Sequence, residues 1–226
     1  MTKIAFFNNK GGVGKSTSAI NVAHAMVQYG KKVIVIDCDN QQNTFQFFTE
    51  GQNTDYRSST RYEKLDITLD TAYDIAFVYD NKIPSNYDYA ILDLPPALDE
   101  RTNQIIADCD FVFVPFELGK FAIQGIAKVT EAIAQSSEKS GVKFGGCFIN
   151  KFDHENTTSH KLEEMLRGIL GDKTMATRIP SSKVIKNSID YRQTAFEYMG
   201  WTDAAGAYGE LTQEIMKICG EEIEHG

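Results

Sequence analysis

Five short apolar runs alternate along the chain with stretches whose apolar residues recur at helical spacing. The runs are continuous rather than alternating, which is typical of strands in a parallel sheet covered on both faces. The stretches between them predict the helices that cover it. We therefore predict an α/β fold, a doubly wound and mostly parallel sheet flanked by helices, with strands at residues 3–8, 32–37, 88–93, 111–116 and 143–150.

The first predicted helix covers residues 15–29 and stops before Gly30, a residue suited to the turn after a helix. In a doubly wound sheet, the ligand crevice lies outside the carboxyl ends of the strands. The polar segment 51–64 is interpreted as an excursion from the core. We expect residues 1–226 to form a single domain. The apolar stripe of the helix consists of Ala19, Ile20, Ala23, Met26 and Val27.

A glycine-rich loop lies between the first predicted strand and this helix. Its glycines let successive N–H groups turn inward around phosphates, and the helix N-terminus adds partial positive charge. We expect Lys15 to reach the β- and γ-phosphates and Ser16 to offer its hydroxyl to Mg²⁺. A strict phosphate loop has glycine where this chain has Asn9. The nucleotide-binding candidates are Lys10, Gly11, Gly12, Val13, Gly14, Lys15, Ser16 and Thr17.

Two further predicted strands end in carboxylates at the same edge of the sheet. The second strand ends in Asp37, followed by Asp39, and the third ends in Asp93, followed by Pro95 and Pro96. An aspartate at the tip of such a strand can hold a water on Mg²⁺, which makes Asp93 and Asp37 metal-site candidates. A D-x-D pair by itself more often ends a strand and opens a turn. The phosphate loop one strand earlier favours the functional interpretation.

Lys10 and Lys15 together match the deviant Walker A motif of the ParA/MinD family of ATPases, which the chain resembles over nearly its whole length. The resemblance implies ATP and Mg²⁺ as ligands, and a sandwich dimer in which Lys10 reaches into the partner subunit's nucleotide. It also implies that Asp39 orients the attacking water. The Asp-x-Pro-Pro pattern that begins at Asp93 belongs to the same resemblance. Asn40 stands where the family usually has proline, which makes this loop less rigid.

The fifth predicted strand leads into Asn150-Lys151-Phe152-Asp153, which has the N-K-x-D spacing that reads guanine in GTPases. ParA-like ATPases also place an asparagine at this strand end, near adenine. Since the deviant Walker A motif is the more specific signal, we favour ATP over GTP. Asn150 is a candidate for the base side with either nucleotide. A later segment, residues 178–183, resembles the family's base-side segment only loosely, and we assign no chemistry to it.

The distribution of charge bears on partners, because the family binds non-specific DNA as its ATP dimer. The net charge is −8, yet residues 173–192 carry five basic side chains and one acid. Phosphate contacts could concentrate there. The competing interpretation is a solvated helix face. Residues 201–226 carry six acids and one lysine, which an anionic membrane surface would repel, so we expect no membrane partner.

The composition of the chain excludes several classes of protein. With 226 residues, 42% of them hydrophobic, the chain can bury one substantial core. No run approaches the roughly 20 apolar residues of a membrane span, and the N-terminus lacks the apolar core of a secretory signal. The four cysteines include no C-x-x-C pair, which argues against a zinc ribbon and a disulfide framework. We expect a cytoplasmic, nucleoid-associated protein.

The predicted function is that of a ParA-type ATPase for plasmid or chromosome partition. By resemblance, the protein forms an ATP-sandwich homodimer, holds non-specific DNA, and releases it when a ParB-like centromere-binding protein stimulates hydrolysis. Two alternatives stay open. One is a MinD-like spatial regulator or another cargo-positioning ATPase, and the other is a small-molecule phosphoryl- or amide-transfer enzyme on the same scaffold.

Overall fold

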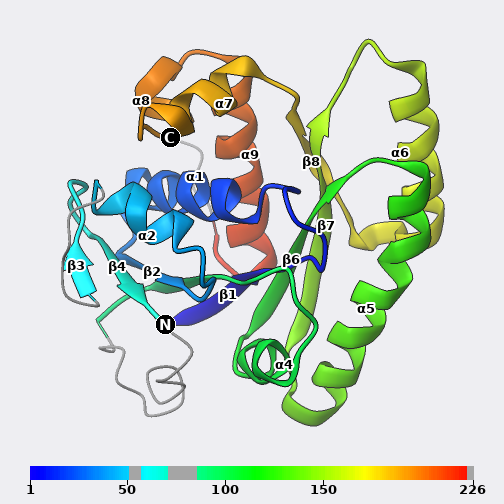
Figure 1. The fold of residues 1–226 in the computed structure, drawn as a ribbon, viewed down its shortest axis with the longest axis horizontal. Helices are drawn as coiled ribbons and strands as arrows, with labels where there is room; N and C mark the ends of the chain where they lie inside the picture. Colours follow the sequence, from blue (N-terminus) through cyan, green and yellow to red (C-terminus); the bar gives the residue numbers. More distant parts are fainter. Residues whose placement is uncertain (51–56, 71–85, 223–226) are drawn as a thin grey trace.

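One eight-stranded sheet forms the centre of the computed structural model, which describes residues 1–50, 57–70 and 86–222 (Figure 1). The strand order is β3-β4-β2-β5-β1-β6-β7-β8, and neighbouring strands are parallel except β3 and β4. The predicted fold class is thus confirmed. The strands are β1 (Thr2–Phe6), β2 (Val33–Asp37), β3 (Arg57–Ser59), β4 (Leu65–Leu69), β5 (Tyr89–Asp93), β6 (Phe111–Glu117), β7 (Lys143–Phe152) and β8 (Thr174–Pro180).

Helices cover both faces of the sheet (Figure 1). One face carries α1 (Lys15–Gln28), α2 (Asn43–Phe48), α7 (Lys183–Asp190), α8 (Ala195–Met199) and α9 (Asp203–Ile218). The other face carries α4 (Glu100–Ala107), α5 (Lys120–Ser140) and α6 (Thr157–Leu170), and a short 3-10 helix, η1 (Gly171–Lys173), follows α6. Among the described residues, no helix is both long and apolar enough to cross a membrane.

Each central strand contributes to two hydrophobic cores, one on either face of the sheet. In β1, Ile4 and Phe6 pack into the core beneath α1 and α9, while Ala5 packs into the core beneath α4 and α5. In β2, Val33 and Val35 point to the first core, and their neighbours in the chain point to the second. Side chains alternate across a strand, so a strand buried on both faces must be apolar at every position.

All five predicted strands are present, with ends shifted by up to two residues. Three further strands, β3, β4 and β8, were not predicted. The interpretation of segment 51–64 as an excursion from the core is wrong in part. Its residues 57–59 form β3, which pairs antiparallel with β4 at the edge of the sheet, and residues 51–56 lie outside the described part. The four cysteines are unpaired, and all but Cys219 are buried.

Candidate nucleotide-binding site

The glycine-rich loop is held from beneath by the end of β7. The Asn150 side chain donates a hydrogen bond to the carbonyl of Val13 at 2.7 Å. Gly14 has φ +98°, and a Cβ at this position would lie 2.0 Å from Nδ2 of Asn150. The loop can therefore follow this path only with glycine at position 14.

The next residue of β7 makes a second attachment to the loop. Lys151 adopts φ 55°, and its Nζ donates to the carbonyl of Gly12 at 2.7 Å while it pairs with Glu117 at 2.9 Å. The N-K-x-D element thus contacts the loop through its first two residues. Asn150 is buried and also lines a cavity on the far side of the loop, so the structure gives this predicted base-side residue a supporting contact as well.

Asp37 and Asp93 lie side by side, because β2 and β5 are parallel neighbours whose register pairs these two residues. Both are buried, with 1% and 0% of their surfaces exposed. Asp37 accepts hydrogen bonds from the backbone N–H groups of Asp39 and Phe45, at 3.0 and 2.8 Å. Asp93 accepts one at 2.6 Å from the Thr44 hydroxyl through Oδ2. The two carboxylates are thereby tied to the loop after β2 and to the start of α2.

The pKa values of Asp37 and Asp93 are both higher than is usual for carboxyl groups. Burial raises the pKa of Asp37 to about 7, and the neighbouring Asp93 carboxylate adds to this rise. Burial also raises the pKa of Asp93 to about 6, against the hydrogen bonds from the hydroxyls of Thr44 and Ser16 and the charge of Lys15. A cation bound between these two buried, neighbouring carboxylates would offset their mutual repulsion, so the pair favours cation binding.

The donor set fits Mg²⁺ bound together with a nucleotide. Oδ1 of Asp93 is buried and has no hydrogen-bond partner in the described part of the chain, and Ser16 lies at the start of α1 next to it. The described part of the chain contains no cluster of three or more His, Cys, Asp or Glu side chains that could bind a metal by itself. Mg²⁺ commonly binds through one or two protein groups plus phosphate oxygens and waters. Ser16 and Asp93, with Asp37 beside them, suit that mode.

A pH-dependent stability follows for the protein without metal and nucleotide. Between the ordinary carboxyl pKa of 3.8 and the folded value of about 6, the folded chain holds a proton on Asp93 that the unfolded chain has released. The free energy of unfolding therefore falls as pH rises through this window. We expect Asp93→Asn to stabilise the protein more at pH 8 than at pH 5, by on the order of 1 kcal/mol. Urea unfolding in EDTA measures the difference, and an equal effect at both pH values would contradict the assignment.

The two lysines of the loop have different environments. Lys15 is 7% exposed, and its Nζ lies 3.4 Å from the carbonyl of Lys10. Burial lowers the pKa of Lys15, whereas the charges of Asp93 and Asp39 oppose that shift. Lys10 is exposed, and its side chain makes no hydrogen bond or ion pair with the described residues. One lysine therefore faces inward and the other faces solvent.

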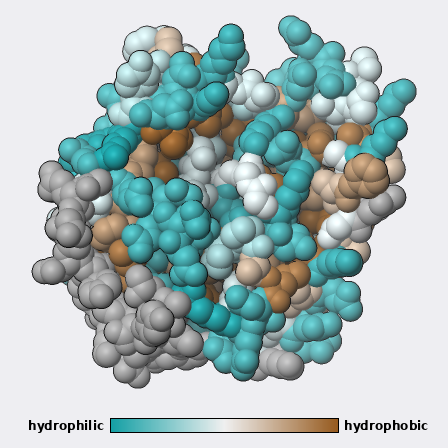
Figure 2. All heavy atoms as spheres, in the orientation of Figure 1, coloured by the Kyte–Doolittle hydropathy of each residue, from teal (hydrophilic) through white to brown (hydrophobic). Residues whose placement is uncertain are grey.

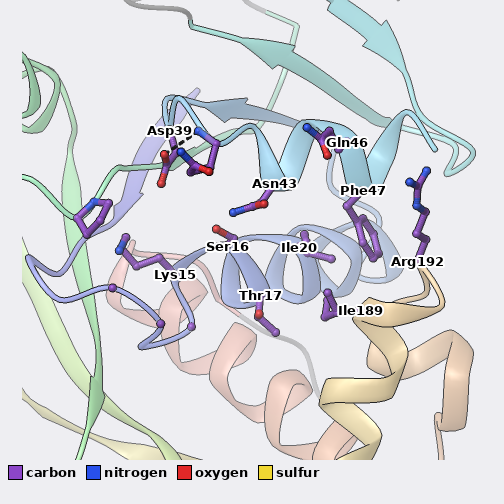
Figure 3. Close-up of a pocket in the computed structure, with 15 residues that line it drawn as sticks. Lys15, Ser16, Thr17, Ile20, Asp39, Asn43, Gln46, Phe47, Ile189 and Arg192 are labelled. Carbon is purple, nitrogen blue, oxygen red and sulfur yellow. Dashed lines mark hydrogen bonds between the residues drawn. The ribbon is translucent and has the colours of Figure 1, made fainter. Parts of the chain in front are cut away.

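A cavity of about 510 Å³ opens above the loop. Lys15, Ser16 and Asp39 face one another across it (Figure 3), and the Oδ1 of Asp39 accepts the N–H of Gln41 at 3.0 Å. The cavity continues along α1 between α2 and α7, where its apolar floor is visible below a polar rim (Figure 2). The residues of this extension are Ile20, Asn43, Gln46, Phe47, Ile189 and Arg192.

A second cavity, of about 490 Å³, lies beyond Thr17 and Ile189, which line both spaces. Asn150 forms one part of its wall, and Pro180 and Ser181 form another. Two spaces thus meet at the start of α1, one beside the carboxylates and one beside Asn150. A nucleotide with its phosphates on the loop has room for its base in the second.

The sequence matches, over residues 4–195, the family model described as the CobQ/CobB/MinD/ParA nucleotide binding domain. The chain belongs to this family. It is 24% identical over 236 residues to the chromosome-partitioning ATPase Soj of Thermus thermophilus, with 95% of each chain covered. The predicted resemblance to ParA/MinD proteins is confirmed, and membership of the family supports ATPase activity in general.

Solved structures of other proteins show the same fold. The ATP complex of a Cyanothece McdA variant has a TM-score of 0.81 at 16% identity, covering 100% of this chain and 99% of that one. Cobyrinic acid a,c-diamide synthase from Mycobacterium smegmatis, with bound ATP analogue and magnesium, has a TM-score of 0.73 at 18% identity, covering 94% and 93%. McdA and a synthase thus share this scaffold, and the function must be argued from the site.

The basic stretch 173–192 does not form one charged face. Arg178 pairs with Glu163 at 2.8 Å and stacks over the ring of Phe152, so its charge is partly neutralised. Arg192, which follows α7 and is exposed, lines the cavity above the loop. Lys173, Lys183 and Lys186 are the exposed cations that remain.

Sequence reasoning missed two parts of the site. Segment 178–183 was assigned no chemistry, yet Pro180 and Ser181 line the cavity beside Asn150. Arg192 was treated as a possible surface contact, yet it lines the extension of the main cavity. The loose family resemblance of the first segment was a usable signal, whereas no local pattern marks Arg192.

Proposed function

We propose that the protein is a Mg²⁺-dependent ParA-type ATPase that forms an ATP-sandwich homodimer, binds non-specific DNA and drives plasmid or chromosome partition. The observation that carries the proposal is the contrast between buried Lys15 and exposed Lys10 on one phosphate loop. Lys15 suffices to bind phosphates within the subunit. A second, solvent-facing lysine beside the same phosphates is suited to a nucleotide held by another subunit.

The side chains around the cavity have separate parts in hydrolysis. The loop N–H groups and Lys15 hold the β- and γ-phosphates, and Asp39 accepts a hydrogen bond from the attacking water and aligns it. Ser16, Asp93 and Asp37 hold Mg²⁺ and its water shell. When bound there, Mg²⁺ would supply positive charge beside the phosphate oxygens. Lys10 of the second subunit adds its charge to the same phosphates.

The cavity beside Asn150 is proposed to hold the adenine base and ribose. Asn150 keeps the loop in place through Val13 and lies next to this cavity, so phosphate and base binding share one residue. Asp153, which completes the N-K-x-D spacing, accepts the backbone N–H of Glu155 at 3.1 Å. This contact uses one carboxylate oxygen, and the preference for ATP over GTP rests on the deviant Walker A motif.

The proposed DNA contacts are the exposed lysines of the basic stretch, Lys173 on η1 and Lys183 and Lys186 on α7. The two lysines of α7 also line the cavity beside Asn150. Binding by surface lysines is electrostatic, independent of base sequence and weakened by salt. A nucleoid-associated location and a ParB-like stimulating partner belong to the same proposal. The Soj and ParA relatives support it, because their names identify them as chromosome-partitioning proteins.

Binding to a random DNA duplex tests the proposal directly. The purified protein is mixed with labelled duplex and Mg²⁺ plus ATP, ADP, GTP or no nucleotide, at low and moderate salt. ATP-specific, salt-sensitive binding is expected. ATP hydrolysis without DNA binding under any condition would contradict the partition function. It would favour the alternative of a small-molecule transfer enzyme, a class that includes the structurally similar cobyrinic acid a,c-diamide synthase. Binding to anionic vesicles in place of DNA would favour the MinD-like alternative.

Lys10→Ala is expected to abolish ATP-driven dimerisation while monomeric ATP binding is retained. The Lys10 side chain has no hydrogen bond or ion pair to lose within the described part of its own subunit, so the fold should be unaffected. Sedimentation with ATP measures the dimer, and fluorescence of a labelled ATP analogue measures binding by the monomer. Lys217→Ala, an exposed lysine on α9 away from the phosphate loop and α5, is the matched control. A Lys10→Ala protein that still dimerises would remove the assigned role of this lysine.

A further inference from the structure

The first turn of α5 carries an unusually exposed aromatic side chain. Phe121 is 88% exposed, the highest value among the large apolar residues of the described chain. Single exposed apolar residues are ordinary, so exposure alone carries no conclusion. The surface beside Phe121 supplies the second observation.

A largely apolar cavity of about 210 Å³ lies on this face, and Phe121 itself forms part of its wall. Its lining includes side chains that are almost fully buried, namely Phe116, Ile126 and Val129, together with Val13 of the phosphate loop. An apolar cavity of about 150 Å³ is enough to hold a benzene ring. The space beside Phe121 is therefore large enough for a phenyl group from outside.

A glycine keeps this cavity open. Gly125 lies within α5 and lines the cavity, and a Cβ built on it would meet nothing within 4 Å. Glycine is among the poorest helix formers, and no close neighbour requires it here. Gly168, Gly206 and Gly209 are also helical glycines with no neighbour within 4 Å, and what distinguishes Gly125 from them is its place in the wall of this cavity.

We propose that in the ATP dimer Phe121 of each subunit inserts into the Gly125 cavity of the other. The inference rests on the proposed dimer. A two-fold interface joins the same patch of both subunits, so it requires a protruding group and a matching hole on one face, and α5 presents both. Lys10 also lines this cavity, which places the hole at the lysine expected to cross between subunits. A second copy of the chain is thus the occupant that fits.

The contact would join the dimer interface to the nucleotide. Val13 lines the cavity through the loop, and its carbonyl is the acceptor for Asn150. A ring inserted beside Val13 therefore packs against the loop that holds the phosphates. Dimer formation and tight nucleotide binding should strengthen each other, because each depends on this arrangement of the loop.

Two variants of the full chain test the insertion from opposite sides. Phe121→Ala removes the protruding ring, and Gly125→Leu fills the hole with a better helix former. With a non-hydrolysable ATP analogue and Mg²⁺, each is expected to raise the dimer dissociation constant at least tenfold in sedimentation experiments. Nucleotide affinity of the dilute monomer should change less than twofold. Trp201→Ala, which removes an aromatic that is 85% exposed far along the chain, should change neither value.

A mixture of the two variants gives the decisive result. A Phe121→Ala subunit keeps its hole and a Gly125→Leu subunit keeps its ring, so a mixed dimer has one intact insertion while either pure dimer has none. The mixture should dimerise more strongly than either variant alone. Wild-type-like dimerisation of Phe121→Ala, or a mixture no stronger than its components, would overturn the insertion and leave the dimer standing. A monomeric wild-type protein would overturn both.

Discussion

Replacing Asp39 by alanine should reduce the rate of ATP hydrolysis by a factor on the order of 10² to 10⁴ and leave ATP binding nearly unchanged. Asp39 lines the cavity opposite Lys15 and is half-buried, so its carboxylate is positioned for a water beside the γ-phosphate. Among the described residues, its carboxylate accepts a hydrogen bond from Gln41 and none from the loop that holds the phosphates. Release of phosphate at saturating ATP measures the rate, and equilibrium titration measures the affinity.

Asp39→Asn separates chemistry from architecture. The amide oxygen of asparagine can still accept the N–H of Gln41, which Asp39 accepts at 3.0 Å, so the turn after β2 is preserved. Asparagine cannot supply the charge or basicity of the carboxylate. Both variants should therefore hydrolyse ATP slowly and accumulate the ATP-bound dimer. An asparagine variant with wild-type turnover would show that Asp39 maintains the turn and takes no part in aligning water.

Gly14→Ala should weaken ATP binding by more than 100-fold and lower the free energy of unfolding by about 2–4 kcal/mol. The new Cβ would lie 2.0 Å from Nδ2 of Asn150, and φ +98° is unfavourable for alanine. Asn150 cannot move aside without giving up its bond to the carbonyl of Val13. Calorimetric titration with ATP and urea unfolding provide the two measurements.

Gly11→Ala is the matched control for stability within the same loop. A Cβ at Gly11 meets nothing within 4 Å, and we expect a change in unfolding free energy within about 0.5 kcal/mol. Combining Gly14→Ala with Asn150→Ala removes the steric clash and leaves the backbone strain. The double variant should be less destabilised than the sum of the two single changes. Simple additivity would contradict the proposed clash.

The sequence was a good guide to strands that are buried on both faces and a poor guide to strands at the edges. β2 and β5 are apolar at every position except the aspartate that ends each strand, and β1 is apolar from Ile4 to Phe6, so their patterns are visible without neighbours. β4 carries polar residues among its apolar ones, and β8 is a strand at the edge of the sheet. Short patterns of this kind acquire their meaning only from the partner strand, which the local sequence does not reveal.

In the candidate site, too, the local sequence predicted some residues well and others poorly. The phosphate loop is contiguous, so the types and spacing of Lys15 and Ser16 were enough to predict their chemistry. The contact of Asn150 with Val13 joins residues that are 137 positions apart, and Arg192 enters the main cavity because the chain turns after α7. Packing between distant segments determines these positions. Even the raised pKa of Asp37 depends on its register with Asp93.

The support that β7 gives to the phosphate loop has a consequence for binding entropy. Asn150 and Lys151 hold the carbonyls of Val13 and Gly12 before any nucleotide arrives. A free glycine-rich loop would lose much conformational freedom when it closes around phosphates. Here that freedom is already lost when the chain folds, so more of the interaction energy with the nucleotide remains as affinity.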